Sequence, residues 1–191
     1  MTVSQRFFEV LKGRLAKATP KPVAKVMALR DASVMAPLFW RDDAPFALLT
    51  KRPMTLSKHP GQIAFPGGGR ERADITPLHT ALRETEEELG IPQDAVTVLG
   101  MLSSVPTPSG FQVTPFVGAI ADGLELRPSP SEIEEILWVP LLRLRPVRRV
   151  LHDAERDAFL YDDAPHVIWG ATHRMIRELL PHVHAAFEET T

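Results

Sequence analysis

The strongest constraint on the fold is a run of three glycines at positions 67–69, followed closely by a segment with complete helix signals. Each glycine costs backbone entropy on folding, so such a run is typical of a place where bare backbone must approach another group. In the segment 76–90, Thr76 is suited to cap a helix, Pro77 to begin it and Gly90 to end it. The sequence therefore predicts a glycine turn that leads into a helix.

One side of this predicted helix is apolar and a neighbouring side is acidic. The apolar positions recur with helical spacing and indicate a buried stripe in which one member is a threonine: Leu78, Ala81, Leu82, Thr85 and Leu89. Glu84, Glu87 and Glu88 are spaced i, i+3 and i+4, which places Glu87 and Glu88 within roughly 60° of Glu84 around the axis, whereas Glu86 points away. Like charges at this spacing destabilise a helix, so the acidic side favours a bound cation.

The glycine run gives the acidic side a further source of oxygen donors. An acidic run alone is usually a solvated surface, but here the glycine turn can fold its backbone against the glutamates. Mg²⁺ takes oxygen ligands, is held by a couple of carboxylates, and leaves its other positions to water and phosphate. We therefore predict a metal site formed by Glu84, Glu87, Glu88 and a backbone carbonyl, for which Gly68 is the candidate.

The rest of the chain shows strand patterns between helices. The first 18 residues are amphipathic and predict a helix, after which residues 19–22 break the pattern. A final helix is expected near 170–180, after a less regular stretch. The expected strands are 32–40 and 46–52, which the turn 41–45 joins into a hairpin, then 62–65, 95–105, 112–120 and 134–140. This order predicts an α/β fold, with helices sandwiching a mixed sheet.

Composition limits the classes of protein to which the chain can belong. The 191 residues, of which 44% are hydrophobic, fit a single domain over 1–191. No stretch reaches the roughly 18 to 20 apolar residues of a membrane helix, and the net charge of −2 gives no overall attraction to nucleic acid or anionic lipid. The densest basic stretch, 143–149, is interpreted as a solvated rim. The absence of cysteine leaves metals to oxygen or nitrogen ligands and favours a cytoplasmic location.

The segment 68–91 resembles the Nudix box, which is usually Gly, five residues, Glu, seven residues, and then Arg-Glu-aliphatic-any-Glu-Glu-any-Gly-aliphatic. The second half is matched by Arg83, Glu84, Glu87, Glu88, Gly90 and Ile91. Thr85 stands in the aliphatic position, and the first acid, Asp74, is followed by eight residues before Arg83. The resemblance implies a Nudix-like α/β/α sandwich, in which we expect Asp74 to fix the loop and not to bind the metal.

The segment before the box is similar to the signature of the coenzyme A pyrophosphatase branch of the Nudix hydrolases. The similarity extends into the later stretches 107–118 and 168–180, so it covers most of the chain. Pro53 and Ser57 depart from the signature, and Ser57 replaces an arginine for which the adjacent Lys58 and His59 are candidate substitutes. The matching positions are Leu48, Leu49, Thr50, Arg52, Gly61, Phe65, Pro66, Gly67 and Gly68.

This resemblance implies a hydrolase that uses Mg²⁺ or Mn²⁺ to cleave the diphosphate of coenzyme A or its derivatives into 3',5'-ADP and 4'-phosphopantetheine. Glu84 and Glu88 are the first candidates for direct metal ligands, and Glu87 is a further one. Arg83 is expected to orient the glutamates. The expected substrate-binding residues are Arg52, Lys58, Gly67 and Gly69.

The general base and the substrate stay open at this stage. Glu132, Glu134 and Glu135 lie before or at the start of the strand 134–140, and any of them could be the base. The catalytic candidates are Glu84, Glu87, Arg83 and Glu132. ADP-ribose, a dinucleotide or a nucleoside triphosphate is the alternative substrate. A nucleotide sensor without turnover is the alternative class, and a homodimer is left open. The expected partner is a small nucleotide, with no nucleic acid and no membrane.

Overall fold

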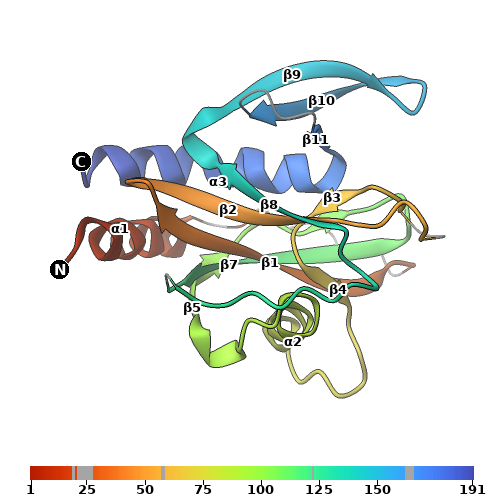
Figure 1. Cartoon of the computed structure of the whole chain (residues 1–191), viewed down its shortest axis with the longest axis horizontal. Coiled ribbons are helices and arrows are strands. Elements are labelled where there is room, and N and C mark those ends of the chain that lie inside the picture. Colours follow the sequence, from red (N-terminus) through yellow and green to blue (C-terminus); the bar gives the residue numbers. More distant parts are fainter. Residues whose placement is uncertain (19, 21–27, 57–58, 122, 162–165) are drawn as a thin grey trace.

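The computed structural model describes residues 1–18, 20, 28–56, 59–121, 123–161 and 166–191. Most of the predicted break at 19–22, together with Ser57 and Lys58, lies outside this part of the chain. Figure 1 shows a layered arrangement, with a sheet between one central helix and the two terminal helices, and a smaller sheet beyond the C-terminal helix. The predicted α/β sandwich is therefore confirmed.

The larger sheet is mixed, as predicted. Its central path runs β3-β2-β1-β7-β5, in which β1 and β7 are parallel while β1 and β2 are antiparallel. Additional pairs join β4 to β1, β6 to β7 and β8 to β2. Among the described residues, its strands are β1 (Arg30–Arg41), β2 (Ala44–Lys51), β3 (Ile63–Ala64), β4 (Gly67–Gly69), β5 (Val96–Met101), β6 (Val105–Pro106), β7 (Phe111–Ile120) and β8 (Glu135–Pro140).

The predicted hairpin between β1 and β2 is confirmed. Asp42 and Asp43 form its tip with φ values of 49° and 56°. Two successive residues of positive φ are typical of the two-residue turn whose twist matches that of the flanking strands.

The glycine run is a strand, and the prediction of a turn at 67–69 was wrong. Strand β4 pairs antiparallel with β1, with Gly68 opposite Ser33 and Gly67 opposite Val34. A Cβ atom at Gly67 would lie 2.4 Å from the carbonyl oxygen of Ser33, so the backbones approach too closely for a side chain. A residue without a side chain is therefore required at Gly67, but in a strand of the sheet and not in a turn.

Helices cover both faces of the larger sheet. Helix α1 (Val3–Lys17) and helix α3 (Gly170–Glu188) pack together on one face, and α2 (Pro77–Leu89) lies on the other (Figure 1). The predicted terminal helices are thus confirmed. In α1, the described side chains Phe7, Leu11 and Leu15 are buried.

Helix α2 begins and ends as predicted. The Thr76 hydroxyl accepts a hydrogen bond from the backbone N–H of His79 at 3.1 Å, and Gly90 ends the helix with a φ of 68°. The polar member of the apolar stripe, Thr85, is fully buried and donates its hydroxyl to the carbonyl of Ala81 at 2.7 Å. This bond satisfies the hydroxyl and explains how threonine fits a position where the Nudix box has an aliphatic residue.

The stretch before α3 is more regular than the sequence predicted. It forms a smaller sheet in the order β11-β10-β9, made of β9 (Leu144–Leu151), β10 (Ala154–Tyr161) and β11 (Ile168–Trp169). Strand β9 includes most of the basic stretch 143–149, whose arginines are exposed, as the interpretation of a solvated rim requires. The strand was missed because its many arginines mask the alternation of apolar residues.

Two short 3-10 helices, η1 (Gln93–Ala95) and η2 (Leu141–Arg143), connect these elements. No helix within the described ranges is long and apolar enough to cross a membrane.

Candidate active site

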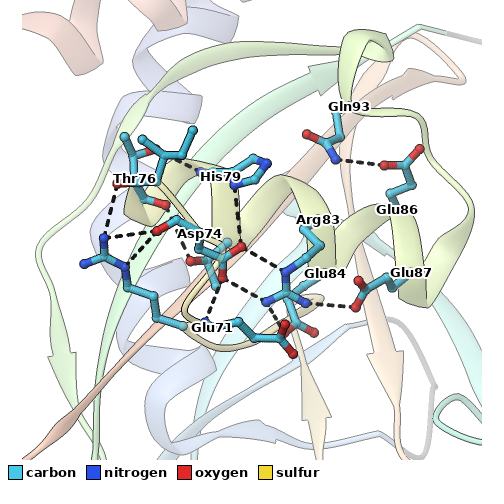
Figure 2. A network of polar contacts seen from close by, with 12 residues as sticks. Glu71, Asp74, Thr76, His79, Arg83, Glu84, Glu86, Glu87 and Gln93 are labelled. Carbon is cyan, nitrogen blue, oxygen red and sulfur yellow. Dashed lines mark hydrogen bonds and ion pairs between the residues drawn. The ribbon is translucent and has the colours of Figure 1, made fainter.

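The acidic side of α2 faces the glycine strand, but its three glutamates differ in burial. Glu88 is 5% exposed, whereas the side chains of Glu84 and Glu87 are 15% and 58% exposed. Glu86 points away and accepts a hydrogen bond from Nε2 of Gln93 at 2.9 Å (Figure 2). The helix therefore presents a gradient from a buried carboxyl group to a solvated one.

The backbone of Gly68 lies against Glu84. A Cβ atom at position 68 would be 2.4 Å from Oε1 and 2.7 Å from Oε2 of that carboxylate. At Gly69, by contrast, the nearest atom to an added Cβ is Cε1 of Phe111 at 3.6 Å, an ordinary contact. The close approach predicted from the glycine run thus exists, and Gly68 is where it meets the acidic helix.

The environment of Glu88 disfavours a negative charge. Burial raises the pKa of Glu88 to about 8, and the negative charges of Glu84 and Glu132 contribute to this rise. The charge of Arg52 and a hydrogen bond from the backbone N–H of Gly67 act in the opposite direction. Burial also raises the pKa of Glu84, although the neighbouring Arg83 lowers it. A cation placed among these carboxylates would favour their ionised forms.

Arg83 connects the acidic side to the loop before the helix (Figure 2). Its Nη1 donates to Oε2 of Glu87 at 2.9 Å, and its Nη2 forms an ion pair with Oε1 of Glu84 at 3.0 Å. Nη2 also donates to the carbonyl of Gly69 at 3.3 Å. Arg83 therefore contacts two of the glutamates and the glycine strand at once.

Asp74 lies behind Arg83, and its side chain is fully buried. Its carboxylate accepts hydrogen bonds from Nε and Nη2 of Arg83, and from the backbone N–H of Glu71 at 2.9 Å. The hydrogen bonds from Arg83 hold the pKa of Asp74 well below its usual range. Arg70 donates to the backbone carbonyls of Asp74 and Ile75. Asp74 therefore fixes the loop, as expected.

Arg52 lies at the edge of the acidic site. Its positive charge lowers the pKa of Glu88, and its backbone pairs with Gln62 and Gly61. Its Nε atom is buried and has no hydrogen-bond partner among the described residues. A buried guanidinium donor without a partner is suited to an anionic ligand.

The three late glutamates are not equivalent. Glu134 accepts a hydrogen bond from Nζ of Lys51 at 2.6 Å, and Glu135 lies 3.3 Å from Nε2 of His166. Glu132 is exposed, and its charge raises the pKa of both Glu84 and Glu88. Of the three, Glu132 is thus the one coupled to the acidic side of α2.

The donor set fits a divalent cation, although the carboxylates are not gathered into a ready-made cluster. No group of three or more His, Asp or Glu side chains in the described part of the chain is arranged to hold a metal ion. Glu84 and Glu87 are instead turned toward Arg83. Two features still match a hard cation: carboxylates whose pKa is raised, and a backbone cradle at Gly68 that a Cβ would fill. The hydrogen bond from the Gly67 amide to Glu88 could not be foreseen from local sequence patterns, because it depends on how β4 pairs with β1.

These features define a class of α/β protein in which a glycine strand and an arginine-braced acidic helix form a site suited to a divalent cation. The chain belongs to the NUDIX family: the sequence model of the NUDIX domain matches residues 29–161. The predicted Nudix resemblance is thereby confirmed.

Curated relatives span nearly the whole chain. The uncharacterized Nudix hydrolase NudL of Enterobacter sp. (strain 638) is 39% identical over 168 residues, which cover 84% of this chain and 86% of the relative. The protein of the same description from Salmonella dublin is 35% identical over 185 residues, covering 94% and 96% of the two chains. The chain is therefore a Nudix hydrolase by family.

Solved structures show the same fold at low sequence identity. The Nudix hydrolase RenU of M. smegmatis has a TM-score of 0.56 and 20% identity, covering 82% of this chain and 86% of that one. A MutT/nudix family protein of Enterococcus faecalis has a TM-score of 0.55 and 17% identity, covering 98% and 75%.

Proposed function

We propose that this Nudix hydrolase cleaves the diphosphate of coenzyme A or its derivatives into 3',5'-ADP and 4'-phosphopantetheine. The observation that supports this most is the unpartnered, buried Nε of Arg52, next to Glu88 and within the segment that resembles the coenzyme A signature. A guanidinium group matches phosphate oxygens in geometry and charge. Arg52 therefore binds a substrate phosphate. Gly67, Gly69 and Lys58, the last of which lies outside the described residues, are proposed as further substrate contacts.

Glu84, Glu88 and the backbone of Gly68 would hold a divalent cation, Mg²⁺ or Mn²⁺, with Glu87 as a further ligand. When bound, such an ion would neutralise charge on the diphosphate and lower the pKa of a coordinated water. Glu88, whose neutral form burial favours, would hold the ion as a carboxylate.

The chain's own groups orient the site and move protons. Arg83 fixes the direction of the Glu84 and Glu87 carboxylates through contacts at 3.0 and 2.9 Å. Glu132 is the proposed general base because it is exposed, electrostatically coupled to the acidic side, and without the cation partners of Glu134 and Glu135. Its carboxylate takes a proton from the attacking water.

The test is a substrate panel with product analysis. Purified protein is incubated with Mg²⁺ or Mn²⁺ and with coenzyme A, dephospho-coenzyme A, ADP-ribose, a dinucleoside polyphosphate or a nucleoside triphosphate. We expect the highest kcat/KM with a coenzyme A substrate and 4'-phosphopantetheine as a product. A preference of more than about tenfold for ADP-ribose would overturn the coenzyme A assignment and leave a Nudix hydrolase. Tight binding without turnover of any nucleotide would instead indicate a sensor.

A further inference from the structure

A groove of about 480 Å³ lies between the β9–β10 hairpin and α3. The hairpin and α3 lie on the side of the larger sheet away from α2 (Figure 1). The apolar wall of the groove comes from the hairpin and includes Pro146, Val147, Ala158 and Phe159. The volume lies within the range of small-molecule sites in proteins, and the groove is separate from the acidic site on α2.

His173 is the most unusual side chain in this groove. It is 6% exposed, and its ring packs on Phe159 with a centroid separation of 4.7 Å. Its ring nitrogens form no hydrogen bond with any described residue. Burial, with help from the positive charge of Arg177, lowers the pKa of His173 and so favours the neutral ring. Neither ring nitrogen of His173 is among the buried polar atoms that lack a partner in the described residues, so the ring N–H is accessible from the groove and can be donated to a ligand there.

The charged residues of the groove leave one positive charge uncompensated. Nε of Arg148 lies 3.7 Å from Oδ1 of Asp157, so these two groups largely offset each other. Arg177, on α3, is exposed and forms no ion pair within the described part of the chain. A singly charged anion balances Arg177, whereas a dianion would add excess negative charge beside Asp157.

We propose that this groove binds a carboxylate with an apolar body, the carboxylate on Arg177 and His173 and the body on the wall formed by Val147, Ala158 and Phe159. The planar guanidinium group matches a carboxylate in two hydrogen bonds, and the neutral imidazole donates a third. This binding site is independent of diphosphate cleavage, because its residues lie outside the acidic site.

Calorimetric titration with octanoate tests the proposal, with inorganic phosphate as the comparison anion. Wild-type protein is expected to bind one octanoate per chain with saturation. The Arg177→Gln variant should bind at least about tenfold more weakly, since a charge-assisted contact is lost. Arg6→Gln removes the same charge from the exposed side of α1 and should leave the affinity unchanged.

A second variant tests the hydrogen bond from the imidazole of His173 separately from the packing of its ring on Phe159. His173→Phe keeps a ring against Phe159 and should still weaken octanoate binding several-fold, and in wild-type protein octanoate should shift the ring resonances of His173 in an NMR titration. Absence of saturable binding, equal affinity in wild type and Arg177→Gln, or equally tight binding of inorganic phosphate would each overturn the proposal.

Discussion

Both carboxylate oxygens of Asp74 accept a hydrogen bond from Arg83, each at 3.0 Å. The side chain of Asp74 is buried, and Arg83 also contacts Glu84 and Glu87 on the acidic side of α2. Because one guanidinium group serves all these carboxylates, the loop before α2 and the glutamates on it share one anchor. A change at Asp74 should therefore affect stability and activity together.

Asp74→Asn should destabilise the protein by about 2 to 3 kcal/mol at pH 7, because a buried charged hydrogen-bond pair loses one partner. The ionised Asp74 stabilises the folded protein fully above the unfolded pKa of about 3.9. This stabilisation is lost as the pH falls toward the lowered pKa of the folded state. The difference between wild type and variant in urea unfolding should therefore shrink below about pH 4. Glu71→Gln, which leaves the backbone donor in place, is the control; a difference independent of pH would contradict this account.

Glu88→Gln should stabilise the protein in EDTA at pH 8 and have little effect at pH 5. The raised pKa of about 8 means that the folded state holds a proton that the unfolded state loses above about pH 4.3. The free energy of unfolding of the wild type is therefore highest, as far as Glu88 is concerned, at low pH, and it declines as the pH rises toward 8. Thermal unfolding at both pH values measures the effect. Glu86→Gln, on the opposite side of the helix, controls for net charge and should show no such pH dependence.

Glu84→Gln and Glu88→Gln should each reduce kcat by roughly 10² to 10⁴, which is typical of removing a preorganised electrostatic contact. Glu86→Gln should keep wild-type activity, because that side chain is exposed and bound to Gln93. Activity is measured across Mg²⁺ and Mn²⁺ concentrations. Wild-type activity that persists in EDTA would rule out the metal role of these glutamates.

Gly68→Ala should lower metal-dependent activity at least about tenfold, because its methyl group occupies the space of the Glu84 carboxylate and forces that side chain to move. Gly69→Ala meets only an ordinary contact and should be near wild type. The matched pair is compared by kcat and by the Mg²⁺ concentration at half-maximal rate. Equal kinetics in both variants would disprove the cradle at Gly68.

Arg52→Ala should lower kcat/KM for coenzyme A by roughly 10- to 150-fold, the effect expected when a charged phosphate contact is lost. Lys51→Ala, a neighbouring cation that pairs with Glu134 and Glu135, serves as the matched control and should have a smaller effect. An unchanged kcat/KM in Arg52→Ala would remove the phosphate role proposed for this arginine.

The sequence predicted the helix over 76–90 in detail because its signals are local: a cap, a proline, an apolar stripe and a final glycine. It also placed Glu86 correctly away from Glu84 and Glu88, since helical geometry alone decides that. Long-range pairing was harder to foresee. The extended glycine strand follows from its pairing with β1, which no local pattern in 67–69 reveals.

Burial explains the remaining gaps. Spacing put Glu84, Glu87 and Glu88 on one side, but only the packing of α2 on the sheet makes Glu88 a buried acid and Glu87 a solvated one. In the same way, the sequence offered Glu132, Glu134 and Glu135 as equals, and their different cation partners depend on where Lys51 and His166 lie.

The closed loop before α2 has a consequence for how such chains change length. Arg70 spans its base by donating to the carbonyls of Asp74 and Ile75, and the hydroxyl of Thr76 then starts the helix. The contacts of Glu71 and of Asp74 hold the two sides of the turn at 72–73, so one additional residue within that turn enlarges the loop and leaves the helix where it was. Insertions and deletions here are the kind of length variation that evolution can accept without displacing Glu84 or Glu88.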